Sequence, residues 1–299
     1  MKLTISDLTQ DREWRASIGM SKKQFFILLE PFKKAYFDTY QKELAKRKVD
    51  VNIDYCIKNE EELLFFTLFS LKAGLTYDVL GFVSGMNGSN AGRNQKIGLD
   101  ILAKALTELN VMPKRKLLTV KDFEELFKEE KDLIFDATEQ RVQRPVDYEK
   151  QKEFFSGKKK AHTLKSMLIS TKDKAIKYLS YCCLGKEHDF SLLKKEFPPV
   201  FDWFEKFNVK VDLGYLGIVK EYKCKSISIP YKKSKNNPLT EEQKIINKKF
   251  ASERIFIEHS ISGLKRFRIL SDRLRIHDID LYDDILGSCA GLWNFYLAN

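Results

Sequence analysis

Residues 131–138, KDLIFDAT, lie where the chain changes from a helical to a strand-like pattern. Their short apolar run predicts a strand that ends in Asp136. Stretches with helical periodicity precede it, and short apolar or alternating runs follow it. The sequence therefore predicts an α/β protein whose sheet begins near residue 131, after an all-helical N-terminal region.

Downstream of this strand, four more strands and several helices are expected. A hairpin with Gly157 near its turn opens the series, and Gly214 and Gly217 close the fourth strand. Thr240-x-x-Gln243 is a capping box that begins a long helix. The predicted strands are the hairpin at 153–170, then 174–185, 208–218 and 224–231; the predicted helices are 188–197, 199–207, the long helix after Thr240, and about 281–297. This order gives a mixed sheet flanked by helices, which is also the order of a ribonuclease H-like domain.

Upstream, residues 60–106 predict three helices with a Gly- and Asn-containing turn before the third. Arg93 and Lys96 lie in the first turns of that third helix, as DNA-contacting residues do in a helix-turn-helix. An ordinary three-helix bundle is the alternative. Residues 1–112 are thus predicted to form an N-terminal helical region, 113–130 a linker and lead-in, and 131–299 the sheet domain.

The composition restricts the class of protein. The chain has 299 residues and a net charge of +11, from 53 Lys and Arg against 42 Asp and Glu, which favours a polyanionic partner such as nucleic acid. Five irregularly spaced cysteines make a disulfide framework or a zinc site improbable. The N-terminus has no apolar signal region, and no apolar run is long enough to cross a membrane. We expect a soluble intracellular protein.

The segment 253–270, ERIFIEHSISGLKRFRIL, places Arg254, Glu258 and Lys265 on one stripe of a helix, because four and seven residues each return to nearly the same face. An acid between two long cations suits a metal-bound carboxylate beside a phosphate backbone. It equally suits a solvated face with an i,i+4 ion pair.

Three acids occupy positions from which they could converge. Asp136 and Asp212 are predicted at strand ends, and Glu258 lies on the long helix. Close carboxylates repel one another, and Mg²⁺ or Mn²⁺, which prefer oxygen ligands, relieve that repulsion. Two such ions can promote in-line phosphodiester displacement. Each aspartate could instead be a turn residue, and Glu258 could simply pair with Arg254.

Three consecutive lysines, Lys158, Lys159 and Lys160, follow Gly157 in the predicted hairpin. They are interpreted either as phosphate contacts or as a solvated basic turn.

Four blocks in order resemble the DDE transposases of bacterial insertion sequences, in the insertion-sequence-five branch, which shares its endonuclease domain with the Harbinger-type transposases. The blocks are DATEQRVQRP at 136–145, FFSGKKKAHTLK at 154–165, VDLGYLGI at 211–218, and 253–270 with its Arg, Glu and Lys spacing. Related transposases carry a Tyr three residues before the Arg, where this chain has Ala251, so no role of that Tyr is transferred.

The resemblance implies a ribonuclease H-like catalytic domain in which Asp136, Asp212 and Glu258 bind two Mg²⁺ or Mn²⁺ ions. It implies that Arg254 and Lys265 contact and position DNA. The implied activity is hydrolysis at the ends of an insertion sequence, followed by joining of the freed 3′-hydroxyl to target DNA. The implied partners are double-stranded DNA, as terminal inverted repeats and target, and a second copy in a dimer or larger assembly, in the bacterial cytoplasm near the nucleoid.

Two alternatives stay open at this point. One is a metal-dependent endonuclease on the same scaffold that cuts without strand transfer. The other is a transposase-derived DNA-binding protein that no longer catalyses a reaction. Joined DNA products would separate the first alternative from a transposase, and a variant lacking Asp136 would separate the second.

Overall fold

The computed structural model describes residues 2–49, 55–233, 238–275 and 278–299. Within these ranges the chain divides into two compact units, one formed by Met1–Met112 with Gly263–Asn299 and the other by Pro113–Ser262. The first unit thus includes a C-terminal segment that the sequence pattern had grouped with the sheet domain. Each unit has its own core.

The first unit is helical. Its central helix, α6, packs against α2, α4, α5 and α13. Close approach of α4 and α6 needs the glycine at position 98, since a Cβ there would lie 1.8 Å from Thr67 Oγ1. The helices of this unit are α1 (Asp11–Ile18), α2 (Lys22–Tyr40), α3 (Leu44–Val49), α4 (Glu60–Ala73), α5 (Tyr77–Ser84), α6 (Gly88–Glu108), α12 (Arg268–Ser271) and α13 (Ile279–Ala298), with a short 3₁₀ helix η1 (Ile5–Asp7). The three helices expected over residues 60–106 are confirmed.

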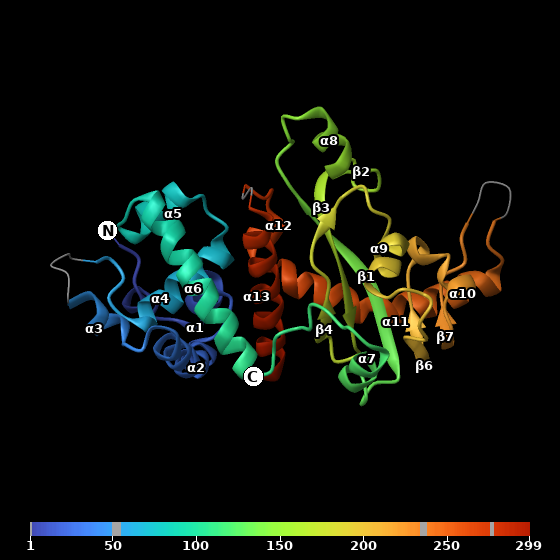
Figure 1. Ribbon diagram of the computed structural model, residues 1–299, viewed down its shortest axis with the longest axis horizontal. Coiled ribbons are helices and arrows are strands. Elements are labelled where there is room, and N and C mark those ends of the chain that lie inside the picture. Colours follow the sequence, from blue (N-terminus) through green and yellow to red (C-terminus); the bar gives the residue numbers. More distant parts are fainter. Residues whose placement is uncertain (1, 50–54, 234–237, 276–277) are drawn as a thin grey trace. The chain divides into compact units, whose positions relative to one another are not determined.

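The second unit contains a curled mixed sheet with helices on its faces (Figure 1). The strand order is β2-β3-β1-β6-β7, and β4 and β5 also pair with β3. β1 runs antiparallel to β3 but parallel to β6, and β6 runs parallel to β7. The strands are β1 (Asp132–Arg141), β2 (Phe155–Ser156), β3 (Ala161–Ser170), β4 (Ile176–Leu179), β5 (Cys183–Leu184), β6 (Phe204–Lys210) and β7 (Cys224–Ser228). The α/β prediction with a mixed sheet is confirmed.

One face of the sheet is buried by an aromatic core. Phe123 is fully buried there, with its ring 4.7 Å from Phe127, 5.4 Å from Phe197 and 5.4 Å from Phe204. Leu133 and Phe135 of β1 point into the same core. The helices of this unit are α7 (Val120–Leu126), α8 (Tyr148–Phe154), α9 (Asp189–Glu196), α10 (Ile218–Glu221) and α11 (Glu241–Lys265), with the 3₁₀ helix η2 (Leu213–Tyr215). Residues of α7, α9 and α10 cover the core side.

Helix α11 lies on the opposite face of the sheet. Figure 1 shows it running across the strands. Glu253 pairs with Lys210 of β6 at 2.7 Å, and Ser260 Oγ donates a hydrogen bond to the Lys174 carbonyl at 2.8 Å. The predicted capping box at its start is confirmed, because Thr240 N–H donates to Gln243 Oε1 and Gln243 N–H donates to Thr240 Oγ1.

Three local predictions are wrong. The strand predicted at 208–218 ends at Lys210, because the chain then turns into η2 and α10. Asp136 does not end its strand, because β1 continues to Arg141 and pairs with β3 along that extension. The segment 199–207 is not a helix: Phe204 begins β6, which obtains its hydrogen bonds from β1 and β7 on either side. Long-range strand pairing thus overrides a local pattern that suited a helix.

In the described part of the chain, no helix is both long enough and apolar enough to cross a membrane.

Candidate active site

Asp136 lies in the middle of β1, on the sheet face opposite the aromatic core. Successive strand residues point to opposite faces, so Leu133 and Phe135 enter the core while Asp136 faces α11. There the Arg254 guanidinium Nη2 lies 2.7 Å from Asp136 Oδ2, and both side chains are largely buried, at 16% and 14% exposure. The Ala137 N–H donates a hydrogen bond of 2.8 Å to Asp136 Oδ1. Each carboxylate oxygen therefore has one fixed partner.

Asp212 is brought level with Asp136 by the register of two parallel strands. Ile134 of β1 is the partner of Lys210 of β6. Because the two strands run parallel, the residues two positions further on, Asp136 and Asp212, lie at the same level. Asp212 caps η2 and accepts a hydrogen bond of 2.8 Å from the Gly214 N–H. It was predicted at a strand end, and it follows the last residue of β6 by two positions.

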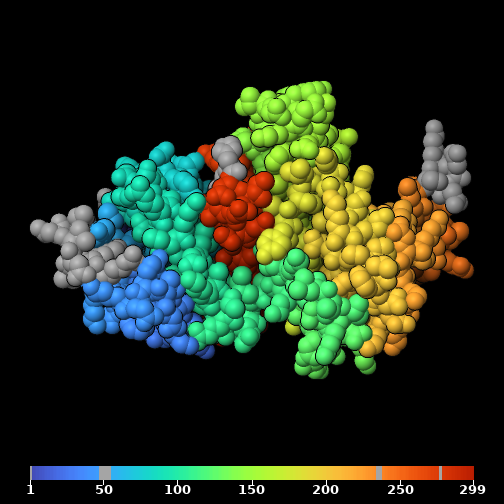
Figure 2. All heavy atoms as spheres, in the orientation of Figure 1, coloured from blue at the N-terminus to red at the C-terminus, as the bar shows by residue number. Residues whose placement is uncertain are grey.

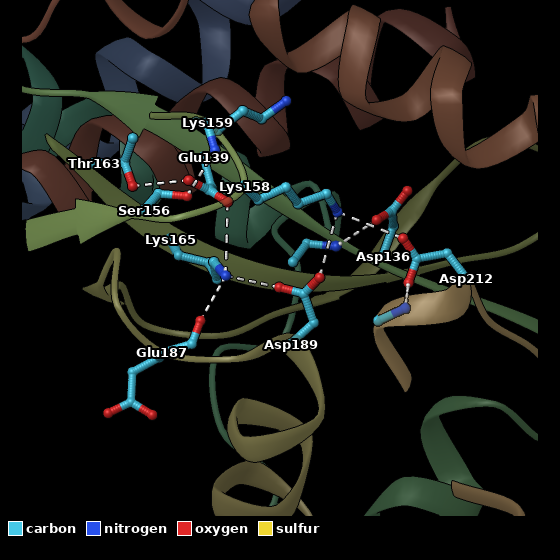
Figure 3. A network of polar contacts seen from close by, with 12 residues as sticks. Asp136, Glu139, Ser156, Lys158, Lys159, Thr163, Lys165, Glu187, Asp189 and Asp212 are labelled. Atoms are coloured by element: carbon cyan, nitrogen blue, oxygen red, sulfur yellow. Dashed lines mark hydrogen bonds and ion pairs between the residues drawn. The ribbon is translucent and has the colours of Figure 1, made fainter. Parts of the chain in front are cut away.

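Lys158 connects Asp212 to a third aspartate, Asp189. Its ammonium lies 3.5 Å from Asp212 Oδ2 and 3.5 Å from Asp189 Oδ2 (Figure 3). Burial opposes its charged form, but the attraction of Asp189, Asp212 and Asp136 outweighs burial and raises the pKa of Lys158. A cation thus already lies among the carboxylates that the sequence singled out.

The ionisation of Asp136 reflects the same crowding. Burial raises the pKa of its carboxyl above the ordinary value of 3.8, and the negative charge of Asp212 adds to this increase. The Arg254 guanidinium and the Ala137 N–H act in the opposite direction. The net shift is upward, and a cation bound beside this carboxyl would oppose it by favouring the ionised form.

Glu258 is placed differently from the two aspartates. It lies one helical turn after Arg254 on α11, but its side chain is exposed. In the ranges that the structure describes, no group of three His, Cys, Asp or Glu side chains is arranged to hold a metal ion. The strand register therefore sets Asp136 level with Asp212, which Lys158 joins to Asp189, and the exposed Glu258 lies outside these contacts.

The other basic residues singled out from the sequence lie in exposed or partly exposed positions. Lys159 and Lys160 are exposed in the β2–β3 turn, where Lys160 adopts a positive φ of 50°. With α8, this turn forms a projection of its unit (Figure 2). Lys96 on α6 pairs with Asp278 at 3.4 Å, and Arg93 donates to Asn90 Oδ1 at 3.3 Å.

Lys265, the last basic residue predicted to contact DNA, ends α11 and is half-buried.

Sequence reasoning missed a buried charge network next to the aspartates. Lys165 of β3 is 5% exposed, and its ammonium lies 2.8 Å from Asp189 Oδ1 and 3.6 Å from Glu139 Oε1 (Figure 3). It also donates to the Glu187 carbonyl at 2.6 Å, while Thr163 Oγ1 donates to Glu139 Oε2 at 2.8 Å. The one available signal was a charged residue, the lysine, within a predicted strand, AHTLKSMLIS, that is otherwise uncharged apart from its histidine.

Tyr215 was also missed. It is fully buried, and its hydroxyl has no hydrogen-bond partner among the described residues. Burial raises its pKa well above the ordinary value, and the negative charges of Asp189, Asp136 and Asp212 add to that increase. A buried hydroxyl without a partner is costly, so this one marks a place where a water or ligand would be accommodated favourably.

The donors around this place fit a hard divalent cation. Asp136 and Asp212 supply carboxylate oxygens, which Mg²⁺ and Mn²⁺ prefer, and the unpartnered Tyr215 hydroxyl could bind a water of such an ion. Gly214 keeps the space open, because a Cβ there would lie 2.7 Å from Asp189 Oδ2 and 2.9 Å from Asp212 Oδ1. The chemistry of the site therefore agrees with a cation held by the two aspartates.

Comparison with known proteins identifies the class. The DDE superfamily endonuclease profile matches residues 135–294, which is more than half of the chain, so the chain belongs to that family. The prediction of a DDE-type family is confirmed. A probable transposase for insertion sequence element IS702 from Microchaete diplosiphon is 29% identical over 304 residues, covering 100% of this chain and 99% of that protein. No solved structure shows a significant match.

Proposed function

We propose that the chain is a transposase that hydrolyses DNA at the ends of an insertion sequence and joins the freed 3′-hydroxyl to target DNA. The observation that carries this proposal is the pair Asp136 and Asp212, set level on parallel strands with Lys158 between them and Asp189. Family membership supports the nuclease step, and likeness to a probable transposase along the whole chain supports strand transfer. Its place of action would be the bacterial cytoplasm, where the nucleoid lies.

In this proposal Asp136, Asp212 and Glu258 form the catalytic triad and would hold two divalent ions. Bound ions of this kind lower the pKa of the attacking water or hydroxyl and stabilise the leaving oxygen of an in-line displacement. Arg254 orients Asp136 through its contact of 2.7 Å. Glu258 would reach the pair by a change of side-chain rotamer once DNA or an ion is present, since it lies on the stripe that carries Arg254.

The basic side chains would hold the DNA backbone. Lys158, with Lys159 and Lys160 on the same projecting turn, would contact phosphates near the cut, because ammonium groups pair readily with phosphate oxygens. Arg254 and Lys265 would do so from α11.

We further propose that the sheet is ribonuclease H-like and that residues 131–299 form the catalytic domain, with 113–130 as its lead-in. An antiparallel β3–β1 pair continued by parallel β6 and β7 supports this proposal.

Residues 1–112 would recognise the terminal inverted repeats, with α5 and α6 as a helix-turn-helix and Arg93 and Lys96 facing DNA. The turn between these helices is tight, since a Cβ on Gly81 would lie 2.6 Å from the Met86 carbonyl oxygen. Pairing of two DNA ends would require a dimer or larger assembly.

The test uses the purified full-length protein, labelled DNA carrying the element end, a target plasmid and Mg²⁺ or Mn²⁺. We expect cleaved ends and joined products from the wild type. Asp136→Asn and Asp212→Asn should each lower both by about a thousandfold, as loss of an electrostatic contact at a reacting centre does. Cleavage without joining would establish an endonuclease instead. Binding without cleavage, unchanged in Asp136→Asn, would establish a DNA-binding protein.

A further inference from the structure

A series of alternating charges leads from the interior of the sheet to the proposed metal ligands. It runs from Glu139 to Lys165, then to Asp189, Lys158 and Asp212, with successive contacts of 3.6, 2.8, 3.5 and 3.5 Å (Figure 3). The first three members are at most 6% exposed. Buried charges of this kind are costly unless each is paired, so the inner half of the series is held in one arrangement.

Asp189 lies in the middle of the series, and each of its carboxylate oxygens faces a different lysine. Its Oδ1 accepts from Lys165 at 2.8 Å, and its Oδ2 lies 3.5 Å from the Lys158 ammonium. Asp189 is also the first residue of α9, whose start is fixed by packing of Leu192 and Leu193 into the aromatic core. The direction of Oδ2 toward Lys158 is therefore set by buried structure on two sides.

Lys158, by contrast, can move between two carboxylates, those of Asp189 and Asp212. Its side chain is 55% exposed on a turn, and its ammonium is equally far from Asp189 and Asp212. A lysine ammonium is a compact charge on a flexible stem. Without Asp189, its remaining carboxylate partner would be Asp212, where it would compete directly with a divalent ion.

We propose that Asp189, anchored by Lys165, is a positioning residue that shares the Lys158 ammonium with Asp212 and keeps it from moving fully onto that aspartate, so that Asp136 and Asp212 can still bind a divalent cation. This inference rests on the proposed function, because it takes those two aspartates as the metal ligands. It assigns Asp189 no contact with DNA or with the reacting atoms. Lys158 remains beside the site, in reach of a phosphate, while Asp189 supplies its permanent counter-charge.

The experiment measures Mn²⁺ binding to the full-length protein without DNA, from the electron paramagnetic resonance signal of free Mn²⁺. Asp189→Asn should raise the dissociation constant about tenfold, the effect of losing one charged hydrogen-bond partner. Lys158→Met alone should change it less than about fivefold, because Asp189 already restrains that ammonium. In the double variant, the effect of Asp189→Asn should largely disappear, because the competing ammonium is gone.

A matched control is Asp202→Asn, which removes an aspartate paired with Lys223 at 3.1 Å elsewhere in the same unit and should leave Mn²⁺ binding unchanged. The inference is overturned if Asp189→Asn weakens binding equally with and without Lys158, since the effect would then be long-range charge alone. It is also overturned if Asp189→Asn matches the control. Thermal unfolding of each variant verifies that it is folded.

Two further outcomes keep the test decisive. If Asp189→Asn does not fold, Lys158→Met decides alone: much tighter Mn²⁺ binding would mean that Lys158 competes strongly in the wild type and that Asp189 does not restrain it. Asp136→Asn and Asp212→Asn should abolish binding. If they leave it unchanged, the proposed metal site fails, and that failure is distinct from failure of the positioning role.

Discussion

The fold holds the three acids of the proposed triad with different firmness. Asp136 lies in β1 and Asp212 just after β6, whereas Glu258 lies on helix α11. Asp136 has a fixed partner on each oxygen, and Asp212 is fixed by the Gly214 N–H and faced by Lys158. Glu258 is exposed, and no such restraint on it is found among the residues that the structure describes. The comparison teaches that the sheet already fixes the positions of Asp136 and Asp212. The third member of the proposed triad, Glu258, is still a solvent-exposed side chain.

Among the variants that test this comparison, the largest effect is expected at that exposed side chain. Glu258→Gln should lower single-turnover cleavage of end DNA by about a hundredfold or more, because a carboxylate that completes a metal site acts on the transition state. Its free energy of unfolding should change by less than about 0.5 kcal/mol, because an exposed side chain supports little packing. Cleavage is followed by gel and unfolding by urea titration.

Glu242→Gln is the matched control, since Glu242 is also exposed and lies on the same helix. Equal activity of both variants would show that Glu258 is an ordinary surface residue, and the proposed triad would lose its third member.

A smaller effect is expected at the buried hydroxyl beside the aspartates. Tyr215→Phe removes a group that has no partner among the described residues, so the protein should be equally stable or up to about 1 kcal/mol more stable. Mn²⁺ binding should nevertheless weaken severalfold if that hydroxyl holds a water of the ion. A loss of stability without any change in Mn²⁺ binding would assign the hydroxyl a structural partner instead.

The smallest effect contrasts two aspartates on one strand. Lys172 pairs with Asp132 at 2.6 Å and, with Asn208 assisting, lowers the pKa of Asp132, whereas burial raises that of Asp136. A lowered pKa means that ionised Asp132 stabilises the fold above pH 3.8 and that this stabilisation disappears as pH falls through the lowered value.

Asp132→Asn should therefore cost less than about 1 kcal/mol near pH 7, because Lys172 is 58% exposed, and nothing in strong acid. Urea unfolding at several pH values measures this. A cost that grows as pH falls would contradict the assignment.

Local patterns predicted most of the elements but not the parts that depend on distant partners. Helix caps such as Thr76 and Thr240 are local hydrogen bonds, so sequence was sufficient for them. The continuation of β1 past Asp136 depends on pairing with β3, and β6 depends on β1 and β7. The local pattern indicated a strand end at Asp136 and a helix at 199–207, because local patterns do not show which distant strands will pair.

The candidate site divides in the same way. Asp136 and Asp212 could be singled out because each follows an apolar run in the sequence and both belong to recognisable motifs. Asp189 could not, because its significance comes from Lys165, which is 24 positions away, and from Lys158. The exposure of Glu258 could not be predicted either, since helical spacing shows which residues share a face of the helix but not how deeply that face is buried.

The register that sets Asp136 beside Asp212 has a consequence for comparing and engineering such chains. Because strand pairing aligns the two acids, the number of residues between β1 and β6 is free to vary, and long insertions there need not disturb the pair. A single residue added within either strand would displace its acid by about 3.3 Å and turn it to the opposite face. Sequence alignments of distant relatives are therefore best anchored on these two strands, and insertion libraries are best confined to the excursion that joins them.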